Sequence, residues 1–116
     1  MSRTIPFTLL EEMTLHLDRR LQPWNMQGEV ETSATIDVDR LRAATRTAID
    51  YHPLAGARRR ESSPVDSAFE WVLSDDPEPA PVVEVDAAEV DLQTVRNRLY
   101  TRRFDLTGEP PFRLVV

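Results

Sequence analysis

Few side chains in this sequence are of the types that perform catalysis or bind ligands. His16 follows Glu12 by four positions, so the carboxylate could orient the imidazole as a general base. The alternative, which we favour, is a histidine partly buried where a helix meets a sheet. His52 directly precedes Pro53, and we expect it to interact with the last carbonyl groups of its helix and not with a substrate.

Three consecutive arginines, Arg58 to Arg60, could bind a phosphate, for which a cofactor nucleotide would be the natural source. Neighbouring residues of a strand alternate between its faces, so the three cannot all contact one ligand. A solvated surface segment is therefore the preferred interpretation. The three glycines, Gly28, Gly56 and Gly108, form no glycine-rich phosphate loop. The sequence thus assigns no catalytic residue, predicts no metal site and leaves any cofactor-binding residues unknown.

Composition excludes further classes of function. The 116 residues contain no cysteine and two histidines, so a thiolate metal site, a disulfide scaffold and a multi-histidine centre within one copy are all excluded. A net charge of −6 argues against a nucleic-acid partner, which requires a concentrated basic face. The chain lacks a signal-peptide pattern and an apolar run near the ~20 residues that cross a bilayer. We expect a cytoplasmic protein without a transmembrane segment.

The first amphipathic helix is predicted to begin at Thr8, because Glu11 three positions later completes a capping box. It should end before Pro23. Its apolar face should comprise four residues at helical spacing: Leu10, Met13, Leu17 and Leu21. Trp24, beyond this helix, and Trp71 are interpreted as hydrophobic anchors.

Two further helices are predicted by their caps and their spacing. One follows Asp37 and ends at about Tyr51, because Pro53 disfavours helical geometry at the residue before it. The other follows Asp91, and its apolar face holds Leu92, Val95 and Leu99.

Alternation of apolar and polar residues predicts strands over Val30–Ile36 and Phe69–Leu73. An acidic, proline-rich connector covers Asp75–Pro81. Shorter strand candidates are Val82–Val85, Phe112–Val116 and, as either strand or exposed loop, Arg58–Arg60. This order of elements predicts an α/β two-layer sandwich, with helices packed on a mostly antiparallel or mixed sheet.

Three blocks, in order, carry a family resemblance. Ile5–Asp18 (IPFTLLEEMTLHLD) is similar to a first helix entered after a P-L-T/S element. Ala34–Arg58 resembles a strand followed by G-x-[LI]-D-x-x-x-L-x-x-A and H-P-x-L, and Arg102–Val116 resembles x-P-F-D-L-x-x-x-P-P-L-R-x-x-L. Together they are spread over nearly the whole chain, from Ile5 to Val116, and resemble the start of the CoA-dependent acyltransferase superfamily. This group includes nonribosomal peptide condensation domains, polyketide-associated acyltransferases, wax ester synthases and alcohol acetyltransferases.

Two positions depart from the family pattern. Arg103 stands where a proline often precedes the F-D-L element. Gly56 occupies a position where condensation domains often have arginine, which favours the ester-forming and polyketide-associated branches.

The resemblance implies a chloramphenicol-acetyltransferase-like lobe. The family's active-site motif, HHxxxDG, is absent from this sequence and in relatives follows the strand that begins here at Phe112. Residues 1–116 are therefore expected to form a single incomplete domain. In the family, the second histidine of the motif accepts a proton from the acceptor as it attacks an acyl thioester. The Leu9–Leu21 helix and the Val30–Ile36 strand would line or support the acceptor side.

Two functions remain open. The first is the N-terminal segment of an acyltransferase, inactive alone, whose full enzyme moves an acyl group from a CoA or carrier-protein thioester to an alcohol or amine. It would bind no permanent cofactor, and its partners would be the remainder of the enzyme, in the same or a separate chain, and an acyl carrier protein. The second is a stand-alone interaction module that completes its sheet with another chain, as the apolar strand at Phe112–Val116 suggests.

Overall fold

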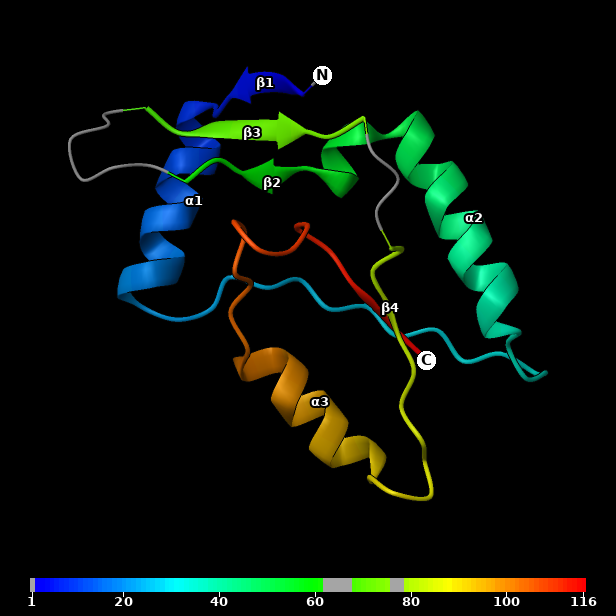
Figure 1. The fold of residues 1–116 in the computed structure, drawn as a ribbon. Helices are drawn as coiled ribbons and strands as arrows, with labels where there is room; N and C mark the ends of the chain where they lie inside the picture. Colours follow the sequence, from blue (N-terminus) through cyan, green and yellow to red (C-terminus); the bar gives the residue numbers. More distant parts are fainter. Residues whose placement is uncertain (1, 62–67, 76–78) are drawn as a thin grey trace.

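The computed structural model describes residues 2–61, 68–75 and 79–116. Within these residues the protein has a mixed α/β fold, which confirms the predicted class. Its helices are α1 (Leu9–Arg20), α2 (Val38–Tyr51), α3 (Leu92–Thr101) and the short 3-10 helix η1 (Pro53–Gly56). Figure 1 shows α1 crossing behind the upper strands, α2 beyond their end and α3 at the opposite end of the molecule.

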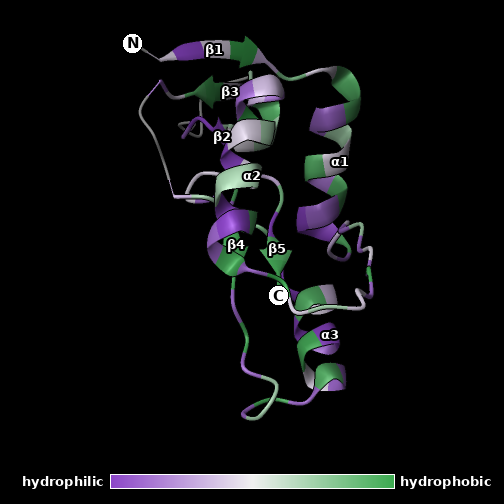
Figure 2. Ribbon diagram, turned by 90° about the vertical axis from the view of Figure 1, so that its right-hand side faces the viewer, coloured by the Kyte–Doolittle hydropathy of each residue, from purple (hydrophilic) through white to green (hydrophobic). Residues whose placement is uncertain are grey.

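The described strands form two separate small sheets instead of one mixed sheet, which corrects the prediction. The first is antiparallel, in the order β1-β3-β2, and consists of β1 (Arg3–Pro6), β3 (Glu70–Leu73) and β2 (Arg58–Arg59). The second is a parallel pair of β4 (Val82–Val83) and β5 (Leu114–Val115). Figure 2 shows α1 standing beside the strands of the first sheet, on one side of them.

The helix termini form where the sequence predicts them. Thr8 and Glu11 complete a reciprocal capping box: the Glu11 N–H donates to Thr8 Oγ1 at 3.2 Å, and the Thr8 N–H donates to Glu11 Oε2 at 2.7 Å. Asp37 accepts from the Arg40 N–H at 3.1 Å, and α2 ends at Tyr51 as expected. These side chains satisfy backbone donors that a helix start would otherwise leave without partners.

Helix α1 buries a different face from the one its sequence predicts. Leu15, outside the predicted stripe, is 8% exposed. Leu10 and Met13, within the stripe, are 71% and 52% exposed. The helix is apolar on more than one side, so spacing alone could not determine which side faces the rest of the described chain.

The strand predicted at Val30–Ile36 does not form, and this prediction is wrong. The segment is irregular, and Val30 is 89% exposed. A strand needs a neighbour for its backbone groups, and no described strand pairs with this segment. The Thr32 hydroxyl instead donates locally to the Ala34 carbonyl oxygen at 2.8 Å, a bond that competes with extended pairing.

The core lies beneath the first sheet, where Ala57, Trp71 and Leu73 are buried. Partly buried apolar residues pack against this cluster: Ile5, Phe7 and Leu106. The sequence pattern does not predict strand β1, which supplies Ile5, because four residues carry too short a pattern. It pairs with β3 along its whole length.

Two other strand predictions are confirmed. The strand predicted at Phe69–Leu73 is confirmed by β3, and β2 resolves the Arg58–Arg60 alternative as a strand over its first two residues. The connector predicted over Asp75–Pro81 includes residues 76–78, which lie outside the described residues. In the part of the chain that is described, no helix is long and apolar enough to span a membrane.

Candidate functional site

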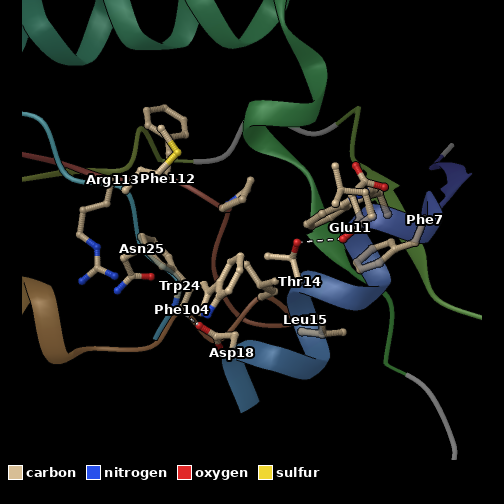
Figure 3. A pocket seen from close by; sticks show the side chains of 15 residues that line it. Phe7, Glu11, Thr14, Leu15, Asp18, Trp24, Asn25, Phe104, Phe112 and Arg113 are labelled. Atoms are coloured by element: carbon tan, nitrogen blue, oxygen red, sulfur yellow. Dashed lines mark hydrogen bonds between the residues drawn. The ribbon is translucent and has the colours of Figure 1, made fainter. Parts of the chain in front are cut away.

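The candidate site is a mainly apolar cavity of 580 Å³ that brings both ends of the sequence together. Aromatic and aliphatic side chains form most of its wall: Phe7, Leu15, Trp71, Phe104, Leu106 and Phe112. Its polar lining includes Glu11, Thr14, Asp18, Asn25 and Arg113. Figure 3 shows Phe7 and Glu11 at one end of the pocket and Arg113 at the other. A cavity of this size and composition is typical of small-molecule sites.

The Phe7 end of the pocket is fixed by aromatic packing. The rings of Phe7 and Trp71 stack with centroids 4.5 Å apart, and Phe69 lies 5.8 Å from Phe7. Trp71 is 9% exposed, and its Nε1 is buried without a hydrogen-bond partner among the described residues. These ring separations lie in the favourable range for aromatic pairs, and the contacts hold the partly buried Phe7 against β3 at this end of the pocket.

An irregular segment, Trp24–Glu29, crosses the pocket beside α1 and is fastened by polar contacts. The Trp24 N–H donates to Asp18 Oδ1 at 2.7 Å, and Asn25 Nδ2 donates to the Arg102 carbonyl at 2.6 Å. The Arg96 guanidinium donates to both carboxylate oxygens of Glu29 at 2.7 Å, and this hydrogen bonding lowers the pKa of Glu29. The segment therefore keeps a defined position without regular secondary structure.

The turn at Asp105–Glu109 positions the pocket's C-terminal wall. Asp105 Oδ1 accepts from the Thr107 hydroxyl at 2.7 Å and from its N–H at 3.2 Å, which lowers the pKa of Asp105. Arg103 donates from Nε to the Asp18 carbonyl oxygen at 2.8 Å. Arginine at this position thus ties the C-terminal segment to the end of α1.

Arg113 has the most unusual environment of the polar lining residues. Its side chain is 10% exposed, and its guanidinium carbon lies 4.6 Å from the centre of the Phe104 ring. The nearest carboxylate oxygen, Glu109 Oε1, is 3.7 Å from Nη2, beyond hydrogen-bond distance. Burial, and secondarily the charge of Arg102, lowers the pKa of Arg113.

Neither histidine lies in the pocket. The side chain of His16 is 49% exposed, its Nε2 is 3.8 Å from Glu12 Oε1, and its ring meets Phe69 edge-on. His16 therefore lies between α1 and the first sheet as predicted, but its side chain is exposed, so the prediction of partial burial is wrong. His52 caps α2 through its backbone, whose N–H donates to the carbonyls of Ala48 and Ile49.

The three arginines at Arg58–Arg60 do not converge on one point. Arg60 pairs with Glu70 on the neighbouring strand at 2.9 Å, and the Arg59 guanidinium lies over the Phe69 ring at 5.7 Å. Arg58 and Arg59 are half-buried, whereas Arg60 is exposed. The expectation of a fully solvated segment therefore holds only for Arg60.

Most of the pocket has no signal in the sequence. The residue types of Trp24 and Trp71 predict only hydrophobic anchors, yet both line the pocket, and Trp24 is 53% exposed. Arg113 stands out in the sequence only as part of the block Arg102–Val116. Apolar side chains distributed over the chain carry no motif, so the only available signal was the resemblance of the first and last blocks. Among the described residues, no group of three or more His, Asp or Glu is placed to hold a metal ion.

Comparison with known proteins finds relatives without an assigned activity. Two uncharacterized proteins of Mycobacterium tuberculosis, from two strains, are each 33% identical to this chain over 116 residues. The match covers 100% of the chain and 26% of each relative, so the chain spans about a quarter of their length. No protein-family model matches the sequence, and no solved structure matches it.

Proposed function

We propose that this chain is the N-terminal part of an acyltransferase lobe of the chloramphenicol-acetyltransferase-like kind. The full enzyme would move an acyl group from a CoA or carrier-protein thioester to an alcohol or amine. The observation that carries the proposal is the ordered resemblance of Ile5–Asp18, Ala34–Arg58 and Arg102–Val116 to the start of that superfamily. The first and last of these blocks meet at the apolar pocket, which supports a shared role in enclosing a substrate.

Exposed apolar surface gives further support. Leu9 and Leu10 on α1 are 77% and 71% exposed, and Met13 on the same helix is also exposed. Leu10 also lines the pocket, so part of this apolar surface continues into it. In the proposed enzyme, the remainder of the protein would cover this face of α1.

In this proposal, residues 1–116 have a structural role and do not transfer a proton. Neither His16 nor His52 lines the pocket, so neither is placed to act as a base on a molecule bound there. The base would be the second histidine of an HHxxxDG motif outside residues 1–116. Residues of α1 and the turn at Asp105–Glu109 would shape the cavity and exclude water from it.

The experiment compares residues 1–116 with the protein as its gene encodes it. Transfer of a radiolabelled acyl group from acyl-CoA and from an acylated carrier protein is measured with a panel of alcohols and amines. We expect transfer by the gene product, none by residues 1–116, and loss of activity when the second histidine of the motif is replaced by alanine. Transfer by residues 1–116 alone, or none by the gene product with any pair, would refute the proposal.

The second candidate is an interaction module, and the edge of β5 favours it. Among the described residues, β5 pairs with β4 on one side and with no strand on the other. A strand edge of this kind can accept a strand from another chain. Replacing Val115 by proline would remove its N–H from that edge. If this replacement abolishes capture of a partner chain while an acyl transfer activity is absent, the module is favoured over the enzyme.

A further inference from the structure

Among the described residues, Arg113 is a largely buried cation for which no hydrogen-bond partner is found, although its nitrogens keep some access to solvent. Its side chain is 10% exposed, and its guanidinium has two contacts among the described residues, the Phe104 ring and the distant Glu109 carboxylate. A guanidinium carries five N–H donors. Buried charged groups are normally paired and hydrogen-bonded, because their desolvation is costly otherwise. Within the described part of the chain, the guanidinium therefore has no protein acceptor within hydrogen-bond distance, and solvent or a ligand would supply one.

The nearby carboxylate is already engaged by other donors. Glu109 Oε1 accepts from the Asp105 N–H at 3.0 Å, and Glu109 Oε2 accepts from Arg102 Nη2 at 3.3 Å. Two arginines thus share one glutamate, so Glu109 alone does not neutralise both of them. An anion bound there would gain a charge-assisted hydrogen bond without displacing an existing pair.

We propose that the pocket binds a monocarboxylate with an apolar body, whose carboxylate pairs with Arg113. The apolar body would lie along the aromatic wall between Arg113 and Phe7, which Figure 3 places at opposite ends. The guanidinium fork matches a carboxylate in two-point geometry. This inference does not depend on acyl transfer, and it holds for an enzyme or a binding module alike.

A phosphate monoester is a poorer match for the same site. The pocket lining also contains the carboxylates of Glu11 and Asp18, and a dianion would be repelled by both while a single arginine neutralised half of its charge. No helix begins at this end of the described pocket with backbone N–H groups that could add donors. The chemistry therefore favours a singly charged, planar acceptor.

Binding is tested by calorimetry on the protein as its gene encodes it. Decanoate, below its micellar concentration, is compared with methyl decanoate and with decyl phosphate at neutral pH. Because the acid and the ester share an apolar body, their difference reports the carboxylate. We expect decanoate to bind roughly tenfold or more tightly than the ester, and more tightly than decyl phosphate.

Three variants locate the effect. Arg113→Gln should remove the preference for acid over ester. Arg46→Gln, a matched change on the exposed surface of α2 outside the pocket, should leave it intact. Thr14→Trp, which fills the pocket from α1, should weaken binding of both ligands.

Some results would overturn the proposal. Equal affinity of the unmodified protein for acid and ester would do so even if Arg113→Gln failed to fold. The same holds for tighter binding of decyl phosphate, for an acid preference that survives Arg113→Gln, and for affinities unchanged by Thr14→Trp.

Discussion

Gly56 is the position where one added methyl group should have the clearest effect on stability. It ends η1 against α2, and a Cβ at this residue would lie 2.7 Å from Ile49 Cγ2. Carbon atoms in contact are normally ~3.5–4.0 Å apart, so the overlap is about 1 Å. Ile49 cannot easily turn this methyl away, because a β-branched side chain in a helix has essentially one χ1 rotamer.

The magnitude follows from two opposing effects. Overpacking by a methyl group costs about 1–3 kcal/mol, whereas Gly→Ala reduces the entropy of the unfolded chain and returns about 0.4–1 kcal/mol. We therefore expect Gly56→Ala to lower the free energy of unfolding by about 1–2 kcal/mol. Urea denaturation followed by far-UV circular dichroism gives this quantity if the transition is two-state.

The chain provides a matched control and a rescue. Gly28→Ala introduces the same methyl where nothing lies within 4 Å, so its urea midpoint should be unchanged or slightly higher. In an Ile49→Ala background the clashing methyl is gone, and Gly56→Ala should cost less. The reasoning is refuted if Gly56→Ala is as stable as the unmodified protein, or if Gly28→Ala is equally destabilising.

Three further effects follow from the hydrogen bonds. Thr8→Ala should lower the free energy of unfolding by about 1 kcal/mol, because it removes the side-chain acceptor of the capping box; an unchanged urea midpoint would contradict this. Hydrogen bonds from Thr94 and Thr107 lower the folded-state pKa values of Asp91 and Asp105. The two ionised carboxylates therefore stabilise the folded protein above their unfolded-state pKa, and this stabilisation is lost as the pH falls through the folded-state pKa. The urea midpoint should therefore fall as the pH drops below about 4, and Asp91→Asn should make the midpoint less dependent on pH. A midpoint that rises as the pH falls would contradict this reasoning. Glu29→Ala should speed amide hydrogen exchange in the Trp24–Glu29 segment, because Glu29 pairs with Arg96 of α3 and helps to hold this segment in place. Exchange in β3, which the pair does not contact, should be unaffected, and equal protection of the segment in both proteins would contradict this.

Local chemistry determined what could be predicted of the fold. The caps at Thr8, Asp37 and Asp91 act on backbone donors within three residues, so the sequence contains the whole interaction. The alternating pattern of Val30–Ile36 is local too, but a strand forms only against a neighbour, which can come from any distance along the chain. None of the described strands supplies that neighbour.

The candidate site was harder to predict because its parts are distant in the sequence. Phe7 and Phe112 line one cavity although more than a hundred positions separate them. Their types give no chemical signal, since aromatic residues are common in cores. The importance of Arg113 depends on its burial and on the absence of a hydrogen bond within the described chain, and neither property can be read from residue type.

The most direct measurement is to read the gene beyond the codon for Val116. An acyltransferase lobe with its base outside residues 1–116 predicts an open frame that encodes HHxxxDG within the next few dozen residues. A stop codon directly after Val116, or a longer frame that never encodes this motif, would contradict it.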